Sequence, residues 1–490
     1  MLTNNNEYLN FVNGKWQPSR SGSTIEVFNP ANRDEVVGRV QASNLEDLEE
    51  AVAIAKETLQ IWKNISSVDR GNFLHKTADI LEERADEIAE IATKEMGKIF
   101  RDTKGEVLRG VAILRYYAQE GMRQMGEVLP SSHKSNLLIT KRVPVGVVGI
   151  ISPWNFPIAI PIWKMAPALI YGNTIVFKPA SETGITAAKI IQAFHDAGFP
   201  AGVVNLVNGR GSVIGQGLSD HPDVQAISFT GSNSVGNQVA ASALKHGAKF
   251  QLEMGGKNPV IIMDDADLEH AAELTVQGAM KQTGQRCTAT SRAYIHESIY
   301  DEFKKIVLQK ASLLKVGNGF DQNVDFGPLA SKQQMNTVVG YIEKGLEEGA
   351  TLLCGGESLK GDLEKGYFVP PTIFENVTQD MTIAKEEIFG PVLALMKINS
   401  IEEAIEMAND TKYGLSASIF TNDITRAFTF INDIETGLVQ INGETGGAEP
   451  QAPFGGMKDS SSQSREQGQA AKEFYTTMKT ITITPVPSNG

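Results

Sequence analysis

The sequence predicts an α/β protein with two domains, each built on a largely parallel β-sheet. From about residue 143 onward, short runs rich in Val and Ile alternate with helical stretches. These runs are almost entirely apolar, which is typical of parallel strands that helices bury on both faces. The chain has 490 residues, a length that allows more than one core.

The composition excludes several classes of protein. A net charge of −13 makes nonspecific binding to nucleic acid or to an anionic membrane improbable. Cys287 and Cys354 are the only cysteines, so a disulfide framework and a Cys-rich zinc site are excluded, and a reducing compartment is favoured. Residues 1–16 have neither a basic nor an apolar leader segment, and we expect a cytoplasmic protein.

One stretch is long enough to suggest a membrane span. Residues 143–163 carry no charge over 21 positions. Prolines at 144, 153, 157 and 161 would break a continuous helix, however. We therefore expect a buried strand followed by a tight apolar loop, and no membrane association.

The expected elements of the first half follow in order. The N-terminal third is expected to be helical, because apolar residues recur at three- and four-residue steps over 68–96 and 103–126. Strands and helices then alternate. The strands are expected at 145–151, 174–178, 203–207 and 224–229, with helices at 182–197 and ending near 246.

A second series of strands and helices begins after a junction near 250–255. The strands are expected at 259–263, 292–296, 392–398 and 438–442, with helices at 266–284, 401–412 and 423–433. Residues 477–484 alternate polar and apolar side chains like an exposed edge strand. Such an edge would invite pairing with another subunit.

Cys287 is the first candidate for chemistry. A lone cysteine is more often a small buried apolar residue than a nucleophile. Cys287, however, lies in the polar turn 284–290 after a predicted helix, and Arg286 precedes it. A neighbouring cation favours the thiolate. Cys354 follows an apolar run and is expected to be structural.

A thiolate nucleophile needs an oxyanion donor and, if its adduct is hydrolysed, a base. Glu253 lies among apolar residues and glycines, where burial would raise its pKa towards neutrality. The alternative is a Glu at a helix end or on the surface. Asn155 lies inside the uncharged run, where it could donate to an oxyanion or cap a turn.

The turns after the predicted strands could bind a nucleotide, because ligands of parallel sheets bind at the carboxyl ends of strands. Lys178 ends one strand, residues 229–232 open a helix, and Gly209, Gly211 and Gly215 cluster in a turn. No GxGxxG or GK[ST] fingerprint occurs, and HExxH and GxSxG are also absent. Metal hydrolysis and the common serine-hydrolase elbow are therefore disfavoured, and no metal site is expected.

Taken together, these residues resemble the aldehyde dehydrogenase superfamily over about residues 8–484. The resemblance rests on seven blocks that occur in the family's order: PWNFP at 153–157, KPAS at 178–181, FTGS at 229–232, LEMGGKNP at 252–259, GQRC at 284–287, EEIFGPV at 386–392 and PFGG at 453–456.

The resemblance implies the architecture of the family. This consists of an atypical Rossmann-like dinucleotide-binding domain, a second α/β catalytic domain and a small β arm for oligomerisation. We expect them at 1–125 with 143–252, at 253–440, and at 126–142 with 470–490. A homodimer or homotetramer is implied.

The resemblance also assigns roles. Cys287 would attack the aldehyde, Asn155 and the Cys287 amide would hold the oxyanion, and Glu253 would activate the water that hydrolyses the thioester. The implied dinucleotide-binding residues are Ile151, Ser152, Pro153, Trp154, Lys178, Pro179, Ala180, Ser181, Gly211, Gly215, Phe229, Thr230, Gly231, Ser232, Met254, Gly255, Glu387 and Phe389.

Ser181 bears on the choice between NADP and NAD. Family members with Glu at this position tend to prefer NAD, because a carboxylate repels a 2′-phosphate. Ser181 removes that repulsion and Lys178 could pair with the phosphate, so NADP is slightly favoured, although Glu182 is adjacent.

Three longer sequence segments indicate the substrate. GQRCTATSR, IPIWKMAPAL and KDSSSQSREQG resemble bacterial 2-oxoglutarate semialdehyde (2,5-dioxopentanoate) dehydrogenases. Arg286 could pair with the substrate carboxylate. Alternatives are succinate semialdehyde, a broad range of aldehydes, transfer to CoA, which Glu253 disfavours, and cofactor-free ester hydrolysis by the Cys–Glu pair.

Overall fold

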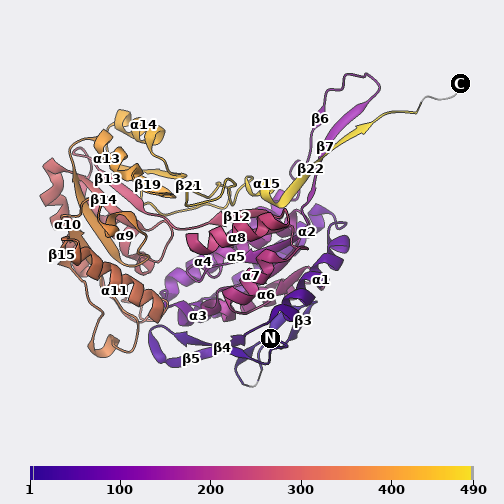
Figure 1. Ribbon diagram of the computed structural model, residues 1–490, viewed down its shortest axis with the longest axis horizontal. Coiled ribbons are helices and arrows are strands. Elements are labelled where there is room, and N and C mark those ends of the chain that lie inside the picture. The colour runs from indigo at the N-terminus through magenta and orange to yellow at the C-terminus, as the bar shows by residue number, and fades with distance from the viewer. Residues whose placement is uncertain (4, 487–490) are drawn as a thin grey trace.

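The computed structural model describes residues 1–3 and 5–486, which form two α/β bodies and a projecting arm (Figure 1). The predicted class of fold is confirmed. The chain passes from the first sheet to the second between Glu253 and Asn258, close to the predicted junction.

The first body is built on a seven-stranded sheet in the order β12-β11-β8-β9-β10-β2-β3. The five strands from β12 to β10 are parallel, whereas β2 and β3 add antiparallel strands at one edge. The strands are β2 (Asn10–Val12), β3 (Lys15–Gln17), β8 (Val147–Ile151), β9 (Thr174–Lys178), β10 (Val204–Leu206), β11 (Ala226–Thr230) and β12 (Lys249–Glu253).

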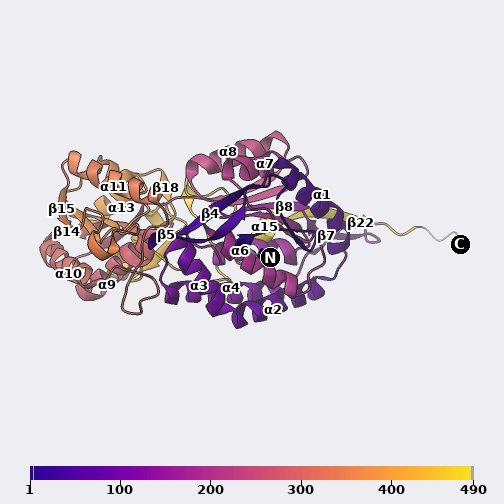
Figure 2. The same ribbon diagram turned by 90° about the horizontal axis from the view of Figure 1, so that it is seen from below.

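Helices cover both faces of this sheet. Figure 2 shows α1, α7 and α8 on one side and α2, α3 and α4 on the other. Two separate apolar clusters form beneath these layers. The helices are α1 (Leu45–Trp62), α2 (Ser67–Glu83), α3 (Ala85–Met96), α4 (Phe100–Glu120), α5 (Ala159–Ile170), α6 (Gly184–Asp196), α7 (Gln216–Asp220) and α8 (Asn233–Lys245).

Two expectations for the N-terminal third were wrong. The described residues among the first 41 form strands and no helix, including a small sheet of β1 (Glu7–Tyr8), β5 (Asn32–Gln41) and β4 (Thr24–Asn29). The helix expected over 103–126 ends at Glu120, where Gly121 packs so closely on Ser67 that a Cβ would lie 2.4 Å from its carbonyl oxygen.

The second body has a seven-stranded sheet in the order β15-β16-β17-β14-β13-β19-β20, parallel except for β15. The strands are β13 (Asn258–Ile262), β14 (Thr290–His296), β15 (Thr351–Cys354), β16 (Thr372–Glu375), β17 (Val392–Ile398), β19 (Ser416–Phe420) and β20 (Leu438–Ile441). The sequence pattern did not indicate β15, β16 or β19.

The helices of the second body also enclose their sheet, with one apolar cluster on each face. They are α9 (Leu268–Met280), α10 (Tyr300–Leu313), α11 (Lys332–Glu347), α12 (Thr382–Lys385), α13 (Ile401–Asn409) and α14 (Ile424–Asp433). The helix expected over 266–284 therefore ends at Met280 and continues as a short 3-10 turn, Lys281–Gly284.

The arm is a three-stranded antiparallel sheet in the order β22-β7-β6 (Figure 1). It consists of β6 (Val128–Leu129), β7 (Leu137–Pro144) and β22 (Thr476–Ile483), and α15 (Ala471–Tyr475) leads into the last strand. β22 is a mostly exposed edge strand, as the alternation over 477–484 predicts. Residues 487–490 of the expected arm lie outside the described residues.

The segment before the arm returns from the second body to the first. After β18 (Tyr413–Gly414) pairs with β21 (Met457–Lys458), the chain runs along β12 (Figure 1). The Met254 amide donates to the Ser460 carbonyl at 2.8 Å, and the Ser462 amide donates to the Leu252 carbonyl at 2.9 Å. Residues far along the sequence are thereby placed at the end of β12.

The uncharged run over 143–163 is divided between β7, β8 and α5, with the turn 152–158 between β8 and α5. Among the described residues, no helix combines the length and the apolar character needed to cross a membrane.

Candidate functional site

Cys287 lies in a constrained turn between α9 and β14. Gln282, Thr283 and Gly284 all adopt left-handed backbone conformations, with φ of 56°, 60° and 65°. A Cβ at Gly284 would lie 2.0 Å from the carbonyl oxygen of Gly390, so only glycine fits there. Such strain in a well-ordered turn is typical of functional sites.

Asn155, in the turn between β8 and α5, lies beside the cysteine turn. Its Nδ2 donates to the carbonyl oxygen of Gln285 at 3.0 Å, and the side chain is buried. This bond uses one N–H of the amide and leaves the other for a second acceptor.

Glu253 is the last residue of β12. It is buried, and it lies close enough to Cys287 for its charge to affect the pKa of the thiol. Its Oε2 accepts from the Ser461 hydroxyl at 2.6 Å, whereas Oε1 has no partner among the described residues. Burial, followed by the charge of Glu466, raises the pKa of Glu253 well above its usual range. The expected direction of this pKa shift is confirmed.

A buried ion pair lies behind Glu253. Lys164 of α5 pairs with Glu466, and the side chains are 0% and 2% exposed. Lys164 also donates to the Ser228 hydroxyl at 3.0 Å. The pair therefore holds the returning C-terminal segment against α5 and β11.

The neighbouring Arg286 does not by itself decide the protonation of Cys287. Burial raises the pKa of the Cys287 thiol to about 12, and the charges of Glu387 and Glu253 add to that rise. Arg286 and the Thr288 amide oppose the shift but are outweighed. The thiol is therefore neutral near pH 7, and a base must take its proton before attack.

Arg286 is engaged away from the thiol. Its guanidinium lies 3.1 Å from Glu444 and donates to the carbonyl oxygens of Gln277 and Gly278 at 3.3 and 2.7 Å. Its Nε has no partner among the described residues, but both terminal nitrogens, which would hold a carboxylate, are engaged inside the protein, so the structure gives no support to Arg286 as the contact for a substrate carboxylate.

The residues expected to bind the dinucleotide converge because parallel strands end at one edge of a sheet. Ile151, Lys178, Thr230 and Glu253 end β8, β9, β11 and β12, and the Ser152 amide donates to the Lys178 carbonyl at 3.2 Å. The turns 152–154, 179–181, 229–232 and 254–255 therefore surround this edge.

The glycine turn after β10 leaves an open cradle there. A Cβ added at Gly211 would meet only the Lys178 Nζ among the described residues, at 4.0 Å. A Cβ added at Gly215 would meet only a methyl group of Ile151, also at 4.0 Å. The Ser181 hydroxyl donates to the Gly209 carbonyl at 3.4 Å. Burial lowers the pKa of Lys178 to about 8, and Glu182 opposes that shift.

Polar groups at the turn after β11 complete the cradle. The Thr230 hydroxyl is buried without a partner, and the Ser232 hydroxyl caps α8. The Gly231 Cα approaches the ring of Phe229, since a Cβ would lie 2.6 Å from it. An orphaned hydroxyl, open glycines and a helix N-terminus suit a dinucleotide.

Glu387 and Phe389 come from the second body and face this edge. The Gly256 amide donates to Glu387 at 2.9 Å, and a Cβ at Gly255 would lie 2.3 Å from its carboxylate. Burial raises the pKa of Glu387 to about 7. Phe389, with φ of 57°, packs edge-on against Trp154 at 5.5 Å between ring centroids.

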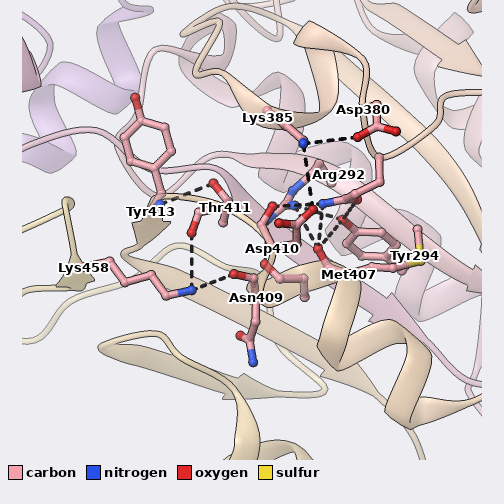
Figure 3. A network of polar contacts seen from close by, with 12 residues as sticks. Arg292, Tyr294, Asp380, Lys385, Met407, Asn409, Asp410, Thr411, Tyr413 and Lys458 are labelled. Atoms are coloured by element: carbon pink, nitrogen blue, oxygen red, sulfur yellow. Dashed lines mark hydrogen bonds and ion pairs between the residues drawn. The ribbon is translucent and has the colours of Figure 1, made fainter.

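A buried arginine fixes the strand that follows the cysteine turn. Arg292 of β14 donates to the Lys257 carbonyl at 2.6 Å and the Ala408 carbonyl at 3.1 Å, and Figure 3 shows its contacts with Tyr294 and Met407. Lys458 of the returning segment donates to the carbonyl of Asn409 in the same region. The network connects β14, the strand that follows the Cys287 turn, to the loop that carries Lys257.

Several site residues carried no sequence signal for the role they have here. Ser461 and Glu466 lie in the segment KDSSSQSREQG and Trp163-Lys164 in IPIWKMAPAL, which had indicated only the substrate. Arg109 lies in an ordinary amphipathic helix. Cys354, as expected, has a structural contact, with its sulfur 3.6 Å from the Pro371 carbonyl.

Comparison with known proteins agrees with this geometry. Residues 16–481 match the aldehyde dehydrogenase family. The chain is 58% identical over 486 residues to an alpha-ketoglutaric semialdehyde dehydrogenase of Bacillus subtilis (strain 168), covering 99% of this chain and 100% of the relative. It is 40% identical over 470 residues to a 2,5-dioxopentanoate dehydrogenase of Saccharolobus solfataricus, covering 95% and 97%.

A solved structure is similar over the whole fold. Betaine aldehyde dehydrogenase from Staphylococcus aureus, in complex with NAD+, has a TM-score of 0.95 and 33% identity to this chain, and the match covers 98% of this chain and 96% of that one.

Proposed function

Because the chain belongs to the aldehyde dehydrogenase family, we propose that it oxidises 2-oxoglutarate semialdehyde (2,5-dioxopentanoate) to 2-oxoglutarate with NADP or NAD. The observation that carries the proposal is one site that holds a cysteine thiol, an amide with a free N–H and a buried carboxylate of raised pKa. The names of the similar proteins support the choice of substrate.

The first step is attack by Cys287. Its sulfur bonds to the aldehyde carbon, and Glu253, whose raised pKa makes it a usable base, accepts the thiol proton. The carbonyl oxygen takes up negative charge, which the free N–H of Asn155 and the backbone amide of Cys287 stabilise. The product is a thiohemiacetal on Cys287.

The residues around the sheet edge hold the cofactor. Lys178 and Ser181 would hold its adenosine ribose, the turn 230–232 its pyrophosphate, and Glu387 its nicotinamide ribose. Bound there, the nicotinamide supplies the hydride acceptor for the oxidation. Cys287 then carries a thioester.

Hydrolysis of the thioester again uses Glu253, after Glu253 has released to solvent the proton that it took from the thiol. Its unpartnered Oε1 is free to accept a proton from water, while Ser461 fixes Oε2. Glu253 thus favours water over CoA as the acyl acceptor. The product leaves as a carboxylate.

The cofactor domain is assigned to 1–125 and 143–252, the catalytic domain to 253–440 and the arm to 126–142 and 470–490. Two open sheet edges support a homodimer or homotetramer. β22 and β20 are edge strands of their sheets. Ile424 and Phe428 of α14, the helix that precedes β20, are 69% and 58% exposed. A cytoplasmic location stays a prediction.

The test is a panel of aldehydes assayed with each nicotinamide. We expect kcat/KM for 2-oxoglutarate semialdehyde to exceed that for succinate semialdehyde and for a neutral aldehyde of the same length. Equal values would contradict the substrate assignment. Ester hydrolysis at the full rate without nicotinamide would contradict the reaction itself.

A further inference from the structure

Arg109 is a cation near the site that has no partner. It lies on α4, and its Nε and one terminal nitrogen are buried without a hydrogen bond to any described residue. No carboxylate of the described residues pairs with it. Lys98 and Lys164 differ, because Lys98 pairs with Glu106 and Lys164 pairs with Glu466, whereas the Nζ of Lys257 also has no partner among the described residues.

The packing of α4 on α5 directs Arg109 towards the site. One turn earlier, Glu106 accepts from the amides of Ile158 and Ala159 at 2.8 and 2.9 Å, directly after the turn that carries Asn155. On the other side, Gly110 packs on α5 so closely that a Cβ would lie 2.6 Å from Ile162. Arg109 therefore lies on the face of α4 that packs against the start of α5.

A second unpartnered donor lies beside it. The guanidinium of Arg109 is 5.9 Å from the ring centroid of Trp163, and the indole Nε1 of Trp163 is also buried without a partner. Trp163 packs on Phe454 at 5.3 Å between ring centroids. Both rings belong to the apolar cluster against which Cys287 packs.

Unpartnered N–H donors, one of them cationic, make a site for an anion. Buried donors in native proteins are nearly always satisfied, and the carboxylate oxygens of a ligand would satisfy these. A guanidinium binds a carboxylate through two parallel hydrogen bonds. Burial lowers the pKa of Arg109, while the charges of Glu106 and Cys287 oppose that shift, which places the cation within electrostatic reach of the nucleophile.

We infer that Arg109, assisted by the indole N–H of Trp163, recognises the substrate carboxylate and so determines the preference for an acidic semialdehyde. The inference rests on the proposed function. In 2-oxoglutarate semialdehyde the carboxylate carbon is four bonds from the aldehyde carbon, about 5 Å when extended. With the aldehyde on Cys287, the acidic end would extend towards Arg109 and Trp163, where Trp163 packs on Phe454.

The test compares Arg109→Met with the wild type on two substrates. For 2-oxoglutarate semialdehyde we expect kcat/KM to fall between about 10- and 100-fold, mainly through KM. For a neutral aldehyde of equal length we expect kcat/KM to stay the same or rise. Arg109→Lys keeps the charge but loses the paired geometry, and should restore part of the loss.

Controls separate recognition from folding. Arg109→Met removes an unpaired buried cation, so its Tm should equal or exceed that of the wild type. Arg286→Met should not change the ratio of kcat/KM between the two substrates. If Arg109→Met lowers kcat/KM for both substrates equally, or for neither, the assignment of Arg109 is overturned. A wild-type enzyme that does not prefer the acidic substrate would instead overturn the proposed function.

Discussion

The carboxylate of Glu253 and the hydroxyl of Ser461 lie 2.6 Å apart, although 208 residues separate them in the chain. The contact joins the end of β12 to the segment that returns from the second body. Because the other carboxylate oxygen has no partner, this hydroxyl is the one side-chain hydrogen bond that positions the proposed base among the described residues.

Ser461→Ala should move the pH dependence of turnover. A hydrogen bond to the carboxylate stabilises its ionised form, so its loss should raise the pKa of Glu253 further. The base must be deprotonated to act, so the acidic limb of kcat/KM should shift to higher pH. Profiles of the two enzymes check this. Ser464→Ala, which removes a hydroxyl bonded to Gln251, is the control and should leave the limb in place.

Glu253→Gln should slow both steps in which Glu253 acts as a base. The amide can accept a proton neither from the thiol nor from water, so we expect one equivalent of reduced nicotinamide to form slowly, then turnover slowed by about 100-fold or more. Intact-mass spectrometry should show the acyl group on the protein, and Cys287 should bear it after digestion. A steady rate with no acylated species would show that another group activates the water.

Cys287→Ala should abolish turnover without preventing cofactor binding, because its sulfur forms both covalent adducts. Binding can be followed by nicotinamide fluorescence. The matched control is Cys354→Ala, which removes the other thiol and should keep its activity. Residual turnover in Cys287→Ala above about a thousandth of the wild-type rate would argue for a different nucleophile.

Ser181→Glu should change the choice of cofactor. A carboxylate at this position would repel a 2′-phosphate near Lys178, so the ratio of kcat/KM for NADP to that for NAD should fall by about tenfold or more. Steady-state kinetics with both cofactors measure the ratio. A wild-type enzyme with a strong preference for NAD would mean that Glu182 already supplies the repulsion.

Lys164→Met should destabilise the protein by about 3–5 kcal/mol, because it leaves Glu466 buried without its partner. Urea-induced unfolding of the first body would measure this. The double variant Lys164→Met/Glu466→Leu should recover much of the loss, since no charge is then left unpaired. Equal destabilisation in the single and double variants would contradict the assignment of the cost to the stranded carboxylate.

Much of the site could be predicted because the sequence marks strand ends. Apolar runs such as 174–178 fixed four strands of the first sheet to within two residues at each end, and the residues that follow them necessarily meet at one edge. The short N-terminal strands and β19 were not found, because their alternation is brief or their composition includes Ser and Ala.

The tertiary part of the site had no such signal. The charge state of Cys287 depends on burial and on Glu387, a residue 100 positions away, and Arg286 turned to Glu444 instead of the thiol. Neighbours in sequence are a poor guide to neighbours in space when the carboxylates lie 100 and 158 positions further along the chain. The lack of a partner for Arg109 is likewise visible only once α4 is packed on α5.

The return of the last residues across β12 also sets the order in which the enzyme is completed during its synthesis. Domains generally fold in sequence as they leave the ribosome, so the first sheet and the thiol at 287 are in place early. Ser461 and Glu466 emerge near the end. A polypeptide that stops short of them keeps a nucleophile but lacks the hydroxyl that orients the base, so only a finished chain can release its acid product.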